Sequence, residues 1–503
     1  MKDYFLLILC IGVCFSSCNK NDDTPIIEEE QEIIEPPEEV NIEVQNFMWQ
    51  TMNTYYFWQG DVIDLADDRF ATQVAYEDFL AETPDPETFL TNKLLFSEDR
   101  FTFYREDYRD LTNLLSGVFK SNGLEFGLSR IGDSDDVYGF VEYIIKDSDA
   151  SVKNIKRGDI FIGVNGTRLN ANNFRGLLFG DEDTYTLNMG TIENNIISPS
   201  GEEVTLTKRE NLQEDPILVN TVLNIGDKRI GYLMYNSFLP GSGEDLNNVF
   251  STFRGENITD LVLDLRYNSG GSGLAATILA GLIYAPNTDE LFYRTRYNAK
   301  LEEAFGSNTD NNFVGTTGTR NGSTDAVLNS LNLDKVYILA TNASASASEL
   351  VMVGLEPYLD VVHIGSRTTG KNQGSLTFVD DPENGNVYDR DREDNINPNV
   401  QWGLQPIISF VENSVGFSDY SDGLIPDIEL DEDVTDLGIL GNPNEPLLAR
   451  AIQEITGTSA KRSFEVNIPS NIISSSKLFD ERRSALILDN IKGAEIKSIA
   501  PKE

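Results

Sequence analysis

A change of sequence pattern near residue 215 constrains the fold more than any other feature of this chain. Beyond it, short apolar runs suited to buried strands alternate with amphipathic stretches of helical period. One of these helices is expected to begin at Ser242 as its cap, and another to run through Leu350 and Leu355. This alternation predicts an α/β core. The expected strands are 229–235, 261–265, 336–340 and 361–364, and a further buried helix is expected over 274–284.

A smaller helical unit is expected ahead of this core, over 42–116. Apolar residues recur there with a helical period, and Asp85 followed by Pro86 is typical of a helix start. The segment 306–325, rich in Asn, Gly and Thr, is expected to be a surface loop. No role follows from the sequence of 458–503.

Residues 117–210 contain short strand patterns broken by Gly and Asp. Within them, the run Ile155–Gly166 resembles the signature of a PDZ domain. Such domains add a peptide strand to a sheet edge and hold the peptide's terminal carboxylate in a backbone loop. The resemblance places Phe126, Gly127 and Leu128 in that loop as peptide-binding residues. A generic β-hairpin turning at Asn165-Gly166 is the alternative.

The three cysteines of the chain all lie in its first 18 residues, so the body can form no disulfide framework. Lys2, an apolar run over 4–15 and Ser16-Ser17-Cys18 have the order of an export signal. The apolar run is too short to span a bilayer. Small residues before Cys18 resemble the bacterial lipoprotein cleavage box, which implies that Cys18 is acylated. A plain secretory signal, cleaved nearby, is the alternative.

The segment 19–41 is acidic and rich in proline, which is typical of a disordered tether. Together with a lipidated Cys18, it predicts a body held on the cell envelope by a lipid anchor only, facing the periplasm or the cell exterior. The formal net charge of −43 repels phosphate backbones, so nucleic acid is not expected as a partner.

The residue inventory limits the chemistry that this chain can perform. His363 is the single histidine, placed within a predicted strand, and the body has no cysteine. A histidine triad, a histidine-rich zinc site and thiol catalysis are therefore not expected, and neither is a metal or another cofactor. The acidic run Asp389–Asp394 lacks the glycine of a calcium loop and is expected to be a solvated loop. Acyl transfer would need a hydroxyl nucleophile with a lysine or carboxylate base.

Three serines and a threonine occur together in Thr341–Glu349, which follows an apolar strand and opens a helix. Unpaired N–H groups at a helix start suit a developing oxyanion. Taken alone, the segment could equally be a cap and a tight helix start. The turn Thr368–Lys371 follows one helix and one strand later, and burial there would disfavour the ammonium form of Lys371 and make it usable as a base. Upstream, Asp264–Gly271 ends in paired glycines that can present an N–H group.

These spaced motifs together resemble the carboxy-terminal processing, or tail-specific, serine proteases, over roughly 117–457. Gly423–Asp427 and a helix near 446–455 fit the same family. The resemblance implies Ser346 as nucleophile and Lys371 as general base. It further implies an oxyanion hole from Ala347 and the Gly270-Gly271 turn, and a crotonase/ClpP-like α/β spiral over 215–457.

The chain departs from the family at three positions. Pro357, Asn372 and Ser375 stand where some members have Asp, Gly and Gln, so the residue that orients Lys371 is open. The sequence thus predicts an envelope endopeptidase acting on proteins or peptides. A catalytically silent PDZ-type binding protein and a hydrolase of non-peptide acyl groups are the alternatives.

Overall fold

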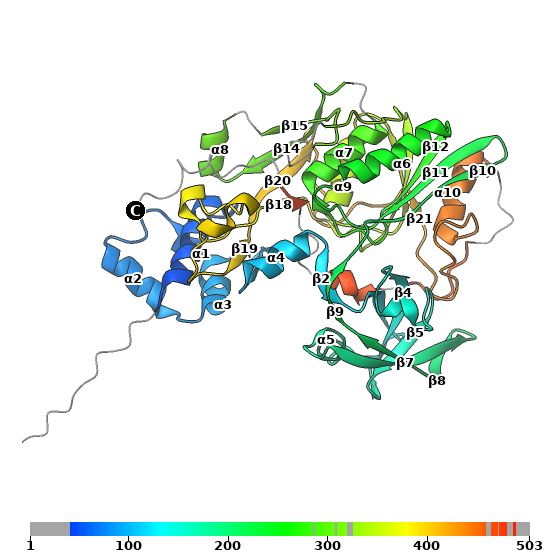
Figure 1. The fold of residues 1–503 in the computed structure, drawn as a ribbon, viewed down its shortest axis with the longest axis horizontal. Coiled ribbons are helices and arrows are strands. Elements are labelled where there is room, and N and C mark those ends of the chain that lie inside the picture. Colours follow the sequence, from blue (N-terminus) through cyan, green and yellow to red (C-terminus); the bar gives the residue numbers. More distant parts are fainter. Residues whose placement is uncertain are drawn as a thin grey trace, which may run out of the picture. The chain divides into compact units, whose positions relative to one another are not determined.

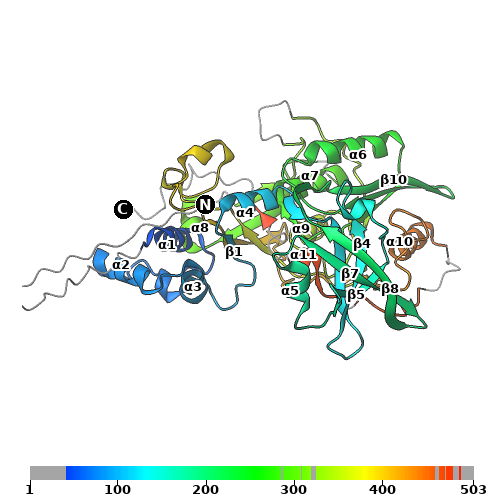
Figure 2. The ribbon, with the colours of Figure 1, turned by 60° about the horizontal axis from the view of Figure 1, so that its bottom comes forward.

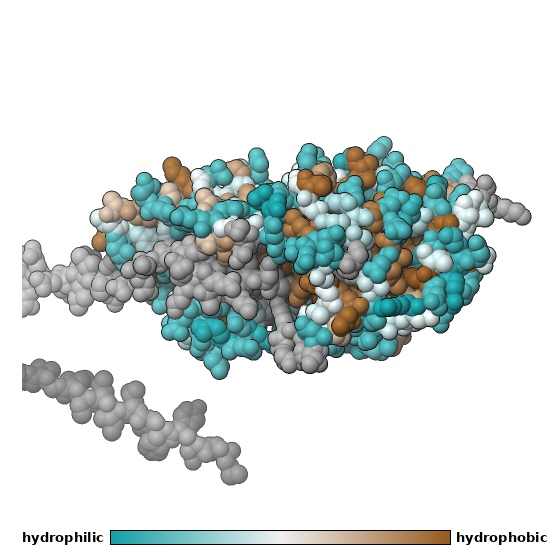
Figure 3. Space-filling view, turned by 90° about the horizontal axis from the view of Figure 1, so that it is seen from above, coloured by the Kyte–Doolittle hydropathy of each residue, from teal (hydrophilic) through white to brown (hydrophobic). Residues whose placement is uncertain are grey.

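The computed structural model describes residues 41–284, 287–306, 309–318, 325–458, 464–470, 472–479 and 486–488. The predicted export segment, Cys18 and almost all of the predicted tether lie outside the described residues. Within the described part, no helix combines the length and the apolar character needed to cross a membrane. Polar side chains cover much of the face shown in Figure 3, with apolar side chains in smaller patches between them.

A six-stranded sheet forms the centre of the α/β part, in the order β10-β11-β12-β16-β17-β21. β10 is antiparallel to β11, and every other neighbouring pair is parallel. This confirms the predicted alternation of strands and helices. The strands are β10 (Ile217–Ile225), β11 (Lys228–Tyr235), β12 (Asp260–Asp264), β16 (Lys335–Ala340), β17 (Asp360–Gly365) and β21 (Ile428–Glu429).

Both faces of this sheet are covered by helices, because alternate side chains of each strand point to opposite sides. On β11, Leu233 packs in the same buried cluster as the helices α6, α7 and α9, whereas Tyr232 packs with α10. Figure 1 shows the first three helices gathered on one side and α10 on the other. The helices are α6 (Gly243–Gly255), α7 (Gly273–Ile283), α9 (Ala347–Leu355) and α10 (Pro446–Thr456).

A second sheet has the order β13-β23-β18-β20-β14-β15 and draws on distant parts of the chain. β15 lies inside 306–325, so the predicted surface loop contains a short strand. It forms because its backbone pairs with β14 and Arg294 bridges to Asp310. β23 comes from the C-terminal segment without a predicted role. The strands are β13 (Gly271–Ser272), β14 (Leu291–Tyr297), β15 (Asp310–Asn312), β18 (Gln373–Ser375), β20 (Ile407–Asn413) and β23 (Leu486–Ile487).

The N-terminal part is helical, as predicted, and Asp85 caps its helix by accepting a hydrogen bond from the Thr88 N–H at 2.8 Å. Its buried side chains belong to the same cluster as α6, α7 and α9. β1 (Phe103–Arg105) pairs with β19 (Gly403–Gln405), so these helices share their core with the α/β part. The helices are α1 (Glu43–Tyr55), α2 (Gln73–Glu82), α3 (Pro86–Phe89) and α4 (Tyr108–Leu115), and α3 continues as a π-helix over Leu90–Leu94.

The β-rich region has its own buried cluster and a sheet in the order β22-β3-β4-β5-β7-β8 (Figure 2). Phe126, Gly127 and Leu128 lie within β3, which pairs with β4. They belong to one of the short strands predicted for this region, and not to a carboxylate-binding loop. Both edges of Leu124–Arg130 are hydrogen-bonded, to β4 on one side and to β22 on the other, and this pairing makes the run a strand. The strands are β3 (Leu124–Arg130), β4 (Val137–Ile144), β5 (Ile160–Val164), β7 (Thr184–Glu193), β8 (Ile196–Thr207) and β22 (Ile472–Ser475).

Candidate active site

Ser346 lies at the point where the loop after β16 enters α9. Its backbone has φ +59°, a conformation that residues other than glycine rarely adopt and that costs about 1–3 kcal/mol. The side chain is 1% exposed, and Oγ has no hydrogen-bond partner among the described residues. A buried hydroxyl without a partner is costly for stability alone, which marks Ser346 as a candidate functional residue.

The two neighbouring serines are held differently. Ser344 Oγ donates to the Leu265 carbonyl at 2.7 Å, and Ser348 Oγ donates to the Asn268 carbonyl at 2.8 Å. Both bonds fasten the serine segment to the turn that follows β12. Of the three serine hydroxyls, only that of Ser346 has no hydrogen-bond partner among the described residues.

The paired glycines of that turn lie directly against Ser346. A Cβ added to Gly270 would sit 2.7 Å from the Cβ of Ser346 and 3.0 Å from its Oγ. Only glycine allows this approach, and φ of +114° also favours it. The Gly270 N–H donates to Asn268 Oδ1 at 2.9 Å, whereas Ala347 is the first residue of α9 and its N–H has no acceptor within the helix. Of the residues predicted for the oxyanion hole, the structure thus places Gly270 against Ser346, and Ala347 follows Ser346 at the start of α9.

Lys371 is 1% exposed, and its Nζ lies 4.5 Å from the ring centroid of Phe101, which precedes β1. The ring face attracts an ammonium group, whereas burial disfavours it. The turn that carries Lys371 is bonded to the serine segment, because the Thr369 N–H donates to the Ser344 carbonyl at 3.0 Å. The N-terminal helical part thus supplies one wall of the lysine's surroundings.

Glu349 is the residue that sequence reasoning missed. Its fully buried carboxylate accepts hydrogen bonds from the Ser346 N–H at 2.8 Å, the Thr368 hydroxyl at 2.5 Å, the Gly370 N–H at 2.7 Å and the Lys371 N–H at 2.8 Å. Burial raises the pKa of Glu349, and these four bonds oppose that rise. One side chain therefore fixes the backbone at both Ser346 and Lys371. The capping-box spacing from Ser346 to Glu349 was a signal that could have found it.

The first part of the glycine turn, Asp264-Leu265-Arg266, has a structural role. Arg266 is fully buried and pairs with Asp264 at 2.8 Å, Glu432 at 3.0 Å and Glu445 at 2.6 Å. Burial alone would raise the pKa of Glu432, but Arg157 and Arg266 hold it below its usual value. Glu445 also caps α10. The network anchors the turn that presents Gly270 to Ser346.

The other residues singled out from the sequence lie apart from this arrangement. His363 is buried in β17, with Nε2 3.3 Å from the Ala340 carbonyl, and burial lowers its pKa. Asn372 donates to the Ser418 carbonyl, and Ser375 accepts from Gln405 at 3.0 Å. The acidic run forms a short 3₁₀ helix, over Arg390–Asn395. Among the described residues, no three His, Cys, Asp or Glu side chains are grouped so that they could hold a metal ion.

Two regions of the chain match protease family models. Residues 229–408 match the model of peptidase family S41, and residues 43–103 match the model of the peptidase S41 N-terminal domain. The first match contains the serine segment, the glycine turn and Lys371. The chain thus contains two regions that match domains of the S41 peptidase family.

One solved structure of similar fold supports this match. A candidate S41 protease from Bacteroides fragilis NCTC 9343 is 25% identical, with a TM-score of 0.60 over 82% of this chain and 97% of that one. The photosystem II D1 C-terminal processing protease is 17% identical, with a TM-score of 0.45 over 81% and 96% of the two chains. Mature CPAF is 12% identical, with a TM-score of 0.42 over 83% and 98%. The chain is a mixed α/β protein similar to S41 proteases.

Proposed function

We propose that this protein is a serine endopeptidase in which Ser346 is the nucleophile and Lys371 the general base. One observation carries the proposal: Ser344 and Ser348 bond to the glycine turn, while the Ser346 hydroxyl lies against Gly270 with no partner among the described residues. The S41 family match over 229–408 supports the same reaction class. The core of this enzyme is a crotonase/ClpP-like α/β spiral.

In this reaction the Ser346 Oγ attacks the carbonyl carbon of a peptide bond while neutral Lys371 takes its proton. The oxyanion that forms is stabilised by N–H groups of Ala347 and the Gly270-Gly271 turn. Lys371 then gives the proton to the leaving amine, and water releases the acyl group by the reverse steps. Glu349 touches none of the reacting atoms. It positions the two residues that do.

The β-rich region acts in this proposal as a PDZ domain that captures substrates by their ends. Its candidate contact is the edge of β3 at Phe126, Gly127 and Leu128, where a peptide can add a strand. Cys18 carries the lipid, and the enzyme acts in the cell envelope. Its substrates are proteins or peptides that expose an unfolded end.

The test is digestion of an unfolded protein by the purified body, followed by mass spectrometry of the products. The wild-type chain should release internal fragments, and Ser346→Ala and Lys371→Arg should release none. Arginine keeps its charge and cannot accept the proton. His363→Gln serves as the comparison and should retain activity. Robust cleavage by Lys371→Arg would contradict the Ser/Lys mechanism, and the absence of cleavage by the wild-type chain would contradict the proposed function.

A further inference from the structure

A strand from the C-terminal segment runs through the candidate active site. β23 lies between β13 and β18 and is parallel to both. Leu486 is level with Gly271 on one side and with Gly374 on the other, and Ile487 is level with Ser272 and Ser375. β13 directly follows Gly270, which touches Ser346, and β18 begins two residues after Lys371. The strand β23 therefore lies between two segments of the candidate site: one that follows the turn against Ser346, and one that follows Lys371.

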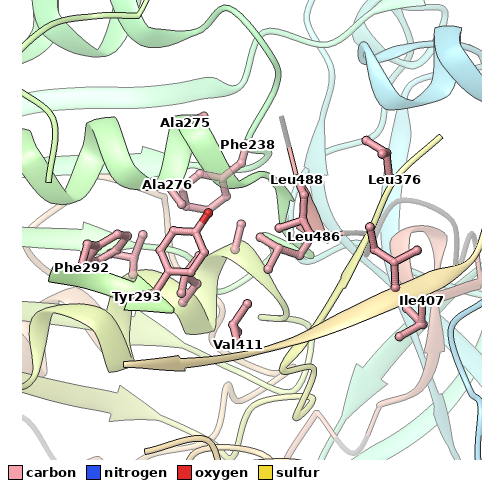
Figure 4. Packing of buried hydrophobic residues seen from close by; sticks show 14 of the residues in the cluster. Phe238, Ala275, Ala276, Phe292, Tyr293, Leu376, Ile407, Val411, Leu486 and Leu488 are labelled. Atoms are coloured by element: carbon pink, nitrogen blue, oxygen red, sulfur yellow. The ribbon is translucent and has the colours of Figure 1, made fainter. Parts of the chain in front are cut away.

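The side chains of β23 are buried in the way that those of a bound peptide would be. Leu486 is fully buried and Leu488 is 1% exposed. Figure 4 shows both among Phe238, Tyr293 and Val411, side chains of the main buried cluster. A Cβ added to Gly374 would lie 3.1 Å from Leu488 Cγ, so this glycine leaves room for the leucine side chain. The Leu488 N–H donates to the Ser375 carbonyl at 3.1 Å. The slot therefore accepts an extended backbone with aliphatic side chains.

The same segment also occupies the edge of β3. β22 is antiparallel to β3, with Ser475 opposite Gly127 and Ser474 opposite Leu128. The Phe126 N–H donates to Ser476 Oγ at 3.0 Å, and Ser476 Oγ donates to Glu125 at 2.6 Å. This is the edge at which the proposed function places a captured peptide.

A buried lysine fastens the segment between these two contacts. Lys477, in α11 (Ser476–Phe479), is 2% exposed, and its Nζ donates to the Asn236 carbonyl at 2.8 Å and lies 3.3 Å from Glu214. A small cavity beside it is lined by Ser269, Gly271, Lys477 and Ile487, among others. The C-terminal segment therefore contacts, in chain order, the edge of β3, the surroundings of Lys477, and the slot between β13 and β18 near Ser346.

We propose that the slot between β13 and β18 is the substrate-binding site and that the segment carrying β22, α11 and β23 occupies it as an intramolecular substrate mimic. This rests on the proposed function. The substrate is an extended peptide that runs parallel to β13 and β18, with an aliphatic residue at the position of Leu486. Because a strand in the slot uses the backbone groups facing it from both sides, substrate and β23 exclude each other.

A binding experiment tests this without relying on turnover. The probe is a fluorescein-labelled peptide of the sequence 472–488, and its anisotropy is measured with full chains that carry Ser346→Ala. The double variant Leu486→Ser/Leu488→Ser should no longer hold β23 in the slot. It should therefore bind the probe at least about tenfold more tightly than the chain with both leucines, because a tethered competitor acts at high effective concentration. Lys477→Ala, which keeps both leucines, should shift binding in the same direction. Ile439→Ser, 72% exposed, is the matched control and should not.

Kinetics with a functional Ser346 separate this inference from the proposed function. In the leucine double variant, the apparent KM for a peptide substrate should fall about tenfold, and the unlabelled 472–488 peptide should inhibit competitively. A peptide with serine at both leucine positions should not inhibit. If the wild-type chain cleaves but no folded variant gains probe binding or a lower KM, the mimic is contradicted and the protease stands. If the variants bind the probe and nothing cleaves, the site stands and the proposed function fails.

Discussion

At the scale of single residues, the candidate site is organised by one carboxylate. Glu349 receives donors from the Ser346 backbone and from the Thr368–Lys371 turn, which lie on different elements. Departures from the family pattern at Pro357, Asn372 and Ser375 left the orientation of Lys371 open in the sequence. Glu349 supplies this orientation through the main chain, at the N–H groups of Gly370 and Lys371.

We expect Glu349→Gln to lower kcat by about 10- to 100-fold, because the uncharged amide can no longer accept from all four donors and each lost bond to a charged group weakens the arrangement by about 1.5–3 kcal/mol. KM should change little, since Glu349 touches no substrate. Steady-state kinetics measure both, and Glu356→Gln, exposed just beyond α9, is the matched control. A rise in KM with unchanged kcat would contradict the positioning role.

The three serines should separate by stability as well as by activity. Ser344→Ala and Ser348→Ala each remove a buried hydrogen bond, so the free energy of unfolding should fall by about 0.5–1.5 kcal/mol or more while activity largely remains. Ser346→Ala removes a hydroxyl with no partner among the described residues, so it should abolish activity without a loss of stability. Thermal melts beside activity assays check this. Equal loss of activity in all three variants would remove the distinction.

His363 should report on acid stability. Burial lowers its pKa in the folded state, so the unfolded chain binds a proton more readily. Its contribution to stability is therefore complete above the unfolded pKa, roughly 6.5, and is lost as pH falls through the folded value. We expect the difference in unfolding free energy between wild type and His363→Gln to shrink or reverse on acidification below about 6.5. Urea unfolding at pH 5 and pH 8 measures it, and an equal difference at both would contradict this.

At the scale of elements, the pattern of strands and helices was predictable, and what joins them was not. β11, β12, β16, β17 and the helices between them were predicted because each has a strong local period. The short strands β15, β22 and β23 have two to four residues each, too few to show a local period. β22 and β23 also pair with segments far away in sequence. A short strand was predicted around Phe126–Leu128, but its pairing with β22 could not be, because a contact from a distant segment cannot be seen in local sequence.

The candidate site divides in the same way. Ser346, Lys371, Ala347 and the glycine turn came from motif spacing, and the structure brings their segments together. The role of Glu349 needs the fold, because its donors are up to 22 positions away. The PDZ assignment and the α/β spiral remain predictions.

Arg266 connects several elements, and we expect its replacement to lower the free energy of unfolding more than any other substitution considered. Arg266→Met leaves the buried carboxylates of Asp264 and Glu445 without their cation, which should lower the free energy of unfolding by about 3–5 kcal/mol. Activity should fall with it, because the next residues form the turn against Ser346. Urea unfolding measures the loss, and Arg254→Met, exposed on α6, is the control. If the free energy of unfolding fell by less than about 1 kcal/mol, the range of a surface ion pair, Arg266 would not have the stabilising role of a buried ion-pair centre.

At the scale of the whole molecule, the described body presents a largely polar face, and the chain carries a net charge of −43. Such a charge gives no attraction to anionic lipid surfaces. If the protein acts at a membrane, its attachment must therefore come from elsewhere in the chain. The proposed lipid on Cys18 meets that need, and the acidic segment 19–41 would separate the body from the lipid surface.

Replacement of Cys18 tests this attachment in intact cells. Cys18→Ser should lose fatty-acid labelling and move from the membrane fraction to the aqueous fraction, because only the thiol accepts a diacylglyceryl group. Two acyl chains give stable anchoring, whereas a single one gives only marginal binding, so the shift should be nearly complete. Cys14→Ser, four positions earlier in the apolar run, is the matched control and should keep both the label and the membrane fraction. Labelling that persists in Cys18→Ser would exclude this cysteine as the anchor, and membrane recovery without any label in the wild type would require another means of attachment.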